Sequence, residues 1–149
     1  MLLDECGADV GTLQHSRMFA AAFVHSLKIA SAQMLKDMLL EPLPVLAGLL
    51  RPFAVNADKA TFVRRTNQIV GLITFVNGEI KAIFLGAHVV NREDQLSDQL
   101  FEAVTEFTSA ENLSTRWSGG AFDGRYILAG VAAQLHSKLN LSPGTFTFR

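Results

Sequence analysis

The sequence contains one cysteine, one tryptophan and one tyrosine among its 149 residues, and its formal net charge is only −1. The lone Cys6 has no disulfide partner within the chain, so we expect a free thiol in a reducing, cytoplasmic compartment. Thirteen basic residues are balanced by fourteen acidic residues. Because such a chain has no overall field that attracts a polyanion, we expect no nucleic-acid partner.

Long apolar runs are also missing. The most apolar stretches, 18–24 and 39–50, fall short of the roughly twenty residues that cross a bilayer, and the second contains a glutamate and two prolines. The first ten residues carry acidic but no basic side chains, which is the reverse of a secretory signal. We therefore expect neither export nor a membrane span.

What the chain has is apolar side chains: 49% of its residues are hydrophobic, 18% are charged, and eleven are phenylalanine. This length is typical of one domain that buries its own core, and the apolar surplus favours a soluble protein that also buries surface against a partner. We expect a single domain over 1–149, with 1–11 flexible, 12–50 helical and 60–149 mixed α/β.

Apolar residues recur in steps of three and four between about Thr12 and Leu40, which predicts one long amphipathic helix ended by Pro42 and Pro44. Further apolar residues widen its apolar face beyond one core contact, so this helix is the candidate interface. The interface candidates are Phe19, Val24, Ile29 and Leu35.

The clearest local pattern is a hairpin. Asn77-Gly78 separates Ile69–Val76 from Glu79–Gly86, two runs rich in β-branched and aromatic residues. Asn and Gly tolerate the positive φ values that a type I′ turn requires at both central positions. The sequence therefore predicts a tight antiparallel hairpin around which the sheet is built, with 60–65 as a further strand and 53–59 as the link that leads to it.

The C-terminal half contains weaker patterns. A helical stripe predicts a second helix from about Arg92 to Thr108, with an acidic outer face. We also expect a short strand at 113–117, a loop at 118–120, a helix at 126–139 and an edge strand at 145–148. The predicted fold class is α+β: a long N-terminal amphipathic helix and two further helices packed on a mainly antiparallel sheet built around the Asn77-Gly78 hairpin.

The run 118–125 combines three glycines with a hydroxyl, a carboxylate and a guanidinium just before a predicted helix. Backbone N–H groups at a helix start favour an anion, and an arginine can bind a phosphate or carboxylate bidentately. Ordinary turn chemistry explains the same residues. The ligand-binding candidates are Ser118, Asp123 and Arg125, with His88 added because it follows a strand whose end could open onto a pocket.

Motifs for the common enzyme classes are missing. The four histidines show no HExxH or HxH spacing, so no metal site or cofactor is expected. No serine lies in a GxSxG context, and no P-loop pattern occurs. The sequence therefore offers no catalytic residue, and an enzyme is the less favoured class.

Part of the predicted order of helices and strands resembles the CheC/CheX chemotaxis phosphatase family. The shared order is a long helix, a strand, the hairpin 71–86 and then helices that contain an Ala-Gly step, here Ala129-Gly130. The positions that correspond to the family's catalytic Glu and Asn hold Asp123 and Tyr126. The resemblance implies at most a degenerate domain of this type without the phosphatase residues, and no catalytic role is carried over.

Three hypotheses remain. The first is a non-enzymatic protein–protein interaction domain, homo-oligomeric and most simply a homodimer, because this explains the apolar surplus. The second is a small-molecule or anion-binding protein or enzyme with a pocket near Asp123 and Arg125. The third is the degenerate phosphatase-like domain.

Overall fold

The computed structural model describes residues 17–109, 111–140 and 146–148. Cys6, His15 and the segment 1–11 that we expected to be flexible lie outside these residues. The chain divides into two compact units, Met1–Leu35 and Lys36–Arg149. The sequence alone predicted one domain over 1–149.

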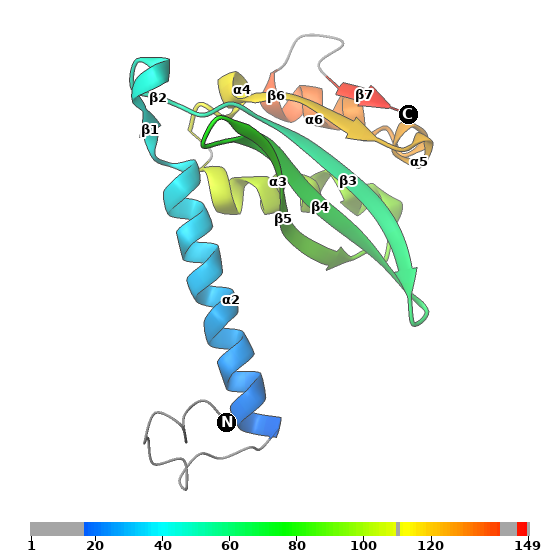
Figure 1. Ribbon diagram of the computed structural model, residues 1–149. Helices are drawn as coiled ribbons and strands as arrows, with labels where there is room; N and C mark the ends of the chain where they lie inside the picture. Colours follow the sequence, from blue (N-terminus) through cyan, green and yellow to red (C-terminus); the bar gives the residue numbers. More distant parts are fainter. Residues whose placement is uncertain (1–16, 110, 141–145, 149) are drawn as a thin grey trace, which may run out of the picture. The chain divides into compact units, whose positions relative to one another are not determined.

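The described part of the first unit is one helix. It belongs to α2 (Arg17–Leu39), whose last turn lies in the second unit (Figure 1). This confirms the predicted long helix over its described residues. Length and composition alone would let α2 cross a bilayer, a test that core helices of soluble proteins also pass. The absence of a membrane span therefore stays a prediction.

The second unit begins with the last turn of α2 and a short connection. Strands β1 (Pro42–Leu43) and β2 (Leu49–Leu50) pair with each other around the 3₁₀ helix η1 (Pro44–Leu46). Pro44 supplies the fixed φ at the start of η1. The predicted proline stop is present, and residues 42–43 and 49–50 are strands within the segment 12–50 that was expected to be helical.

A five-stranded mixed sheet forms the body of the second unit, in the order β5-β4-β3-β6-β7 (Figure 1). Its strands are β3 (Phe53–Phe62), β4 (Arg65–Val76), β5 (Glu79–Val89), β6 (Trp117–Phe122) and β7 (Phe146–Phe148). The first three form an antiparallel meander, whereas β6 runs parallel to β3 and β7 runs parallel to β6. The chain therefore adds β4 and β5 on one side of β3 and β6 and β7 on the other.

The Asn77-Gly78 hairpin is confirmed. Val76 pairs with Glu79, and the two turn residues have φ values of 53° and 79°. The prediction for the preceding segment is wrong, because 53–59 is no link but most of the central strand β3. The first hairpin turns at Val63-Arg64. This pair carries no turn signature, so the sequence pattern placed a strand across it.

Three helices cover one face of the sheet or pack beside it: α3 (Leu96–Thr108), preceded by η2 (Glu93–Gln95), α5 (Gly124–Leu128) and α6 (Val131–Leu139). Helix α3 contacts β4 and β5, and α6 contacts α3. This confirms the second predicted helix. The predicted third helix is present but broken, because Gly130 takes a positive φ of 67° between α5 and α6.

The core lies between this helical layer and the sheet. Alternate strand residues point into it, and they meet the apolar stripe of α3. The fully buried members include Phe53, Val55, Val70, Leu72, Leu96, Leu100 and Val104. The α+β class and the packing of helices on a sheet are therefore as predicted.

The prediction for 113–120 is wrong. Residues 113–116 form the short helix α4 (Leu113–Arg116), and the predicted loop 118–120 lies inside β6. Close packing explains the glycine in this strand: a Cβ on Gly120 would lie 2.7 Å from the Phe122 ring and 2.9 Å from the Val55 carbonyl oxygen. Gly120 therefore permits β6 to approach β3 closely. The same glycine was the basis for the predicted loop at 118–120.

Arg116 is a buried cation held by backbone carbonyls. Its side chain is 4% exposed, and it donates hydrogen bonds to the carbonyl oxygens of Leu39, Arg51 and Thr108. Leu39 and Thr108 are the last residues of α2 and α3, where the helix dipole favours a positive charge. Burial, and then the charge of Arg51, lower the pKa of Arg116.

Candidate functional site

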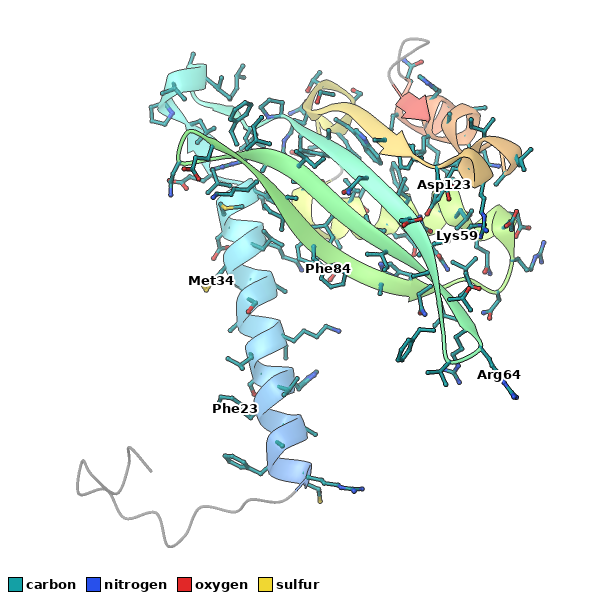
Figure 2. The ribbon with its side chains drawn as sticks, turned by 45° about the vertical axis from the view of Figure 1, so that its right-hand side comes forward. Phe23, Met34, Lys59, Arg64, Phe84 and Asp123 are labelled. Atoms are coloured by element: carbon teal, nitrogen blue, oxygen red, sulfur yellow. The ribbon has the colours of Figure 1, made fainter. Side chains whose placement is uncertain are left out.

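The second unit exposes the sheet face opposite α3. Residues on this face alternate with the buried ones, and Phe75, Ile80 and Phe84 are each more than half exposed. Figure 2 shows the Phe84 side chain on β5. The register places these residues beside Ala54, Asn56 and Asp58 of β3 by way of Ile69, Gly71 and Ile73 of β4. We call this surface the open face.

Two carboxylates lie side by side where β6 ends beside the middle of β3. The parallel register pairs Asn56 with Ala121 and Ala57 with Phe122, so the next step along both strands brings Asp58 beside Asp123. Both carboxylates line one hollow of about 330 Å³, together with Asn56 and Ala121. In open sheets with parallel strands, ligands bind outside the carboxyl ends of strands at the point where the strand order reverses. In this sheet the strand order reverses between β3 and β6, because β4 and β5 follow on one side of β3 and β6 and β7 on the other.

Local structure fixes both carboxylates. An oxygen of Asp123 accepts a hydrogen bond of 3.0 Å from the backbone N–H of Arg125, which caps the start of α5. An oxygen of Asp58 accepts a bond of 2.8 Å from the backbone N–H of Lys59. Each carboxylate keeps lone pairs for another partner.

The nearest lysine in the sequence does not neutralise this pair. Lys59 follows Asp58 in β3, so its side chain points to the other face. Its ammonium group lies 2.5 Å from a carboxylate oxygen of Glu93, and the lysine side chain is only 5% exposed. Figure 2 shows Lys59 and Asp123 at the same end of the sheet. The ion pair joins β3 to η2.

A buried hydroxyl lies within the field of the two carboxylates. Tyr126 is fully buried, stacks on Phe122 with ring centroids 5.4 Å apart, and its hydroxyl has no hydrogen-bond partner among the described residues. Burial first, then the charges of Asp123 and Asp58, raise the pKa of Tyr126 above its ordinary value. The two negative charges therefore act on a buried phenol that forms no hydrogen bond with another described residue.

Asn56 extends the polar part of the open face. A Cβ on Gly71 would overlap the side-chain oxygen of Asn56, so the glycine leaves room for this amide to lie across β4. The amide borders the carboxylate hollow and a second hollow of about 290 Å³ that reaches Phe84. Amide and carboxylate oxygens are ligands that hard divalent cations accept.

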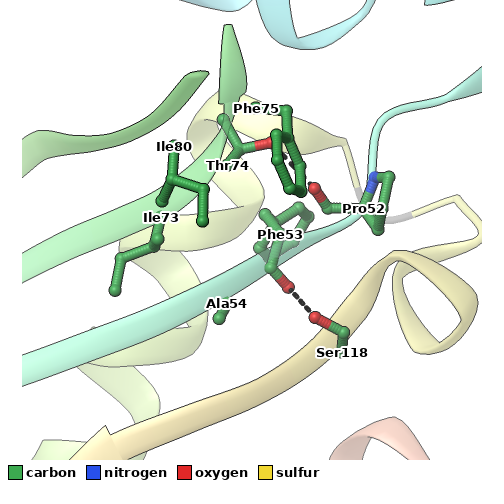
Figure 3. Close-up of a pocket in the computed structure, with 8 residues that line it drawn as sticks. All are labelled: Pro52, Phe53, Ala54, Ile73, Thr74, Phe75, Ile80 and Ser118. Atoms are coloured by element: carbon green, nitrogen blue, oxygen red, sulfur yellow. Dashed lines mark hydrogen bonds between the residues drawn. The ribbon is translucent and has the colours of Figure 1, made fainter. Parts of the chain in front are cut away.

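The sequence-predicted ligand residues do not converge. Asp123 reaches the carboxylate hollow, whereas Ser118 lies at the other end of β6 and donates a hydrogen bond of 2.9 Å to the Phe53 carbonyl oxygen. Figure 3 shows Ser118 at a separate hollow of about 190 Å³ beside Phe53 and Phe75. Arg125 is exposed on α5. His88 lies on β5, where it pairs with Gln68, and strands β4 and β3 separate it from β6.

The residue that the sequence analysis missed is Asp58. It fell in the segment that was interpreted as a link, where an aspartate is unremarkable. The alternation Phe53, Val55, Ala57 was the signal that could have identified a strand and placed Asp58 on its outer face.

Among the described residues, no group of three or more His, Cys, Asp or Glu side chains could enclose a metal ion. The pair would thus supply only part of a cation's ligands. No family model matches the chain, and no curated protein matches it either.

Proposed function

We propose that the second unit binds a phosphate-bearing ligand through a divalent cation held by Asp58 and Asp123. The observation that supports this is their side-by-side position over one hollow, with Asp123 directly after the carboxyl end of β6 and Asp58 within the neighbouring parallel strand β3. Magnesium is typically bound by one or two carboxylates, with substrate phosphates and water completing its six ligands. A cation that binds both the protein and a phosphate therefore needs a protein site that supplies only some of its six ligands.

A titration with Mn²⁺, followed by electron paramagnetic resonance, tests this proposal. Asp58→Asn and Asp123→Asn should each weaken Mn²⁺ binding by about tenfold or more, because each removes a charged ligand. Asparagine keeps the helix cap at position 123, so both variants should fold. Inorganic pyrophosphate should strengthen Mn²⁺ binding to the unchanged protein.

The matched control is Asp98→Asn. Asp98 is an exposed carboxylate on α3 that pairs with Lys138, and its loss should leave Mn²⁺ binding unchanged. Equal binding by all three variants and the unchanged protein would refute the proposal.

A second candidate function is self-association through residues 17–35, and the exposure of this helix favours it. Apart from Leu35, its large apolar side chains are about half exposed or more, and a single helix has no core of its own. The seam Ala20, Phe23, Leu27, Ala30 and Met34 follows the three-and-four spacing of a coiled coil, with Arg17 and Lys28 off the seam. Lys28 lies away from the seam and Arg17 flanks only its first turn, so most of the seam lets a second copy pack without like-charge repulsion.

Light scattering over a range of micromolar concentrations tests this second candidate. The unchanged chain should be a dimer, and Phe23→Ser with Leu27→Ser should make it a monomer, since both changes place polar groups in the seam. Val45→Ser, at an 88% exposed site in η1, is the control and should leave the mass unchanged. A monomeric unchanged chain would exclude this function.

A further inference from the structure

The turn between β3 and β4 has an unfavourable sequence for its conformation. Val63 and Arg64 have φ values of 47° and 61°, the positive pair of a type I′ turn. For a β-branched residue a positive φ is a genuine outlier. The other hairpin of the same sheet has Asn77-Gly78 in this conformation, and these two residue types adopt a positive φ at much lower cost than valine and arginine. Outliers of this kind persist where a surface has another use.

The side chains at this turn are apolar and basic, and they face solvent. Phe62 and Val63 are each 75% exposed, and Arg64 and Arg65 are exposed as well. Figure 2 shows Arg64 extending from the end of the β3–β4 hairpin. Among the described residues, neither arginine takes part in an ion pair. We call Phe62–Arg65 the hairpin tip.

Part of the hairpin tip lies on the same face as the carboxylate pair. Phe62 stands two alternations beyond Asp58 on β3, and Arg65 is the cross-strand partner of Phe62. The four residues from Asp58 to Phe62 span about 13 Å at roughly 3.3 Å per residue. The segment 60–69 contains no acidic residue. A linear anion on the open face would therefore meet a cation site at one end and the Arg65 side chain at the other, with the exposed Arg64 beyond it at the turn.

We propose that the hairpin tip binds the backbone of a nucleic-acid strand, one phosphate of which reaches the cation at Asp58 and Asp123. This rests on the proposed function of that pair. Guanidinium groups bind phosphates bidentately, and an exposed phenylalanine offers a face on which a base stacks.

A nucleic-acid strand fits better than an anionic membrane. Lipid-binding segments typically carry four to eight basic residues in a cluster, whereas the hairpin tip carries two. The cation site and the hairpin tip lie on the same face of β3, one after the other along the strand. A polymer with repeated phosphates can contact both places at once. The net charge of −1 argues against general attraction of nucleic acid, so binding is confined to this tip and its salt dependence is small.

Fluorescence anisotropy with a short labelled single-stranded oligonucleotide in Mg²⁺ tests the tip. Arg64→Gln with Arg65→Gln should weaken binding about tenfold or more and lower the salt slope by about 1.4, at about 0.7 for each phosphate that is no longer neutralised. Phe62→Ser should also weaken binding. The matched control, Lys81→Gln with Arg92→Gln, removes two exposed cations elsewhere and should leave binding unchanged.

Further measurements separate this inference from the proposed function. The tip variants should keep the Mn²⁺ affinity of the unchanged protein. Normal Mn²⁺ binding with oligonucleotide binding that ignores the tip variants overturns the tip proposal alone, whereas absent Mn²⁺ binding overturns the function on which it rests. Phosphatidylserine vesicles are the remaining probe: tip-dependent sedimentation with vesicles, without tip-dependent oligonucleotide binding, would overturn the nucleic-acid assignment.

Discussion

Arg116→Met should lower the free energy of unfolding of the second unit by about 3 kcal/mol or more. Three buried carbonyl oxygens, on Leu39, Arg51 and Thr108, lose their donor, and each unsatisfied buried group costs at least about 1 kcal/mol. Two of these carbonyls end helices, so the change also removes a favourable charge–dipole interaction. Urea denaturation followed by circular dichroism measures the difference.

Arg116→Lys and Arg92→Met calibrate this result. Lysine keeps the charge but not the planar fork, so it should restore only part of the stability. Arg92 is an exposed arginine paired with Asp94, and its loss should change stability by less than about 0.5 kcal/mol. If Arg116→Met were as mild as Arg92→Met, the buried guanidinium would not be the link between the two helix ends and the sheet.

The second large effect should appear at alkaline pH. Because burial and two carboxylates raise the pKa of Tyr126, the folded state keeps the phenolic proton where the unfolded chain has lost it. The free energy of unfolding is therefore unaffected by Tyr126 ionisation at neutral pH. Above about pH 10 it falls by up to about 1.4 kcal/mol per pH unit. Tyr126 is the only tyrosine, so its ultraviolet titration is read directly.

Tyr126→Phe should abolish this contribution to alkaline unfolding. At neutral pH the variant should be as stable as the unchanged protein or slightly more stable, since it removes a buried hydroxyl that has no partner within the described ranges. Asp123→Asn should shift the phenol titration to lower pH, because one of the two charges is gone. A phenol that titrates near pH 10 in the folded protein would contradict the burial of Tyr126.

Local patterns in the sequence predicted the elements that local physics determines. The long helix, the Asn77-Gly78 hairpin and the helix at 96–108 each follow from periodicity or turn chemistry. The first strand was missed because Val63-Arg64 turns without glycine, asparagine or proline. Strand β6 was missed for the opposite reason: Gly119-Gly120 resembles a turn, but Gly120 is required by the close approach of Val55 and Phe122.

The candidate site was only partly predictable. Asp123 could be selected because it precedes a helix in a glycine-rich run. Its partner depends on which strands lie side by side, and no local pattern states that β6 joins β3 rather than the edge of the meander. His88 shows the converse: the end of its strand suggested a pocket, yet two strands separate it from Asp123.

The pairing of β3 with β6 also determines when the site can form. Ser118 and Phe53, which join these strands by a hydrogen bond, are 65 residues apart in sequence, whereas β3, β4 and β5 are joined by two-residue turns. Local hairpins close in microseconds, and distant pairings pay a larger loop-closure entropy. A chain that is still being synthesised can therefore complete the meander before Asp123 has left the ribosome, and Asp58 and Asp123 come together only when β6 has docked beside β3.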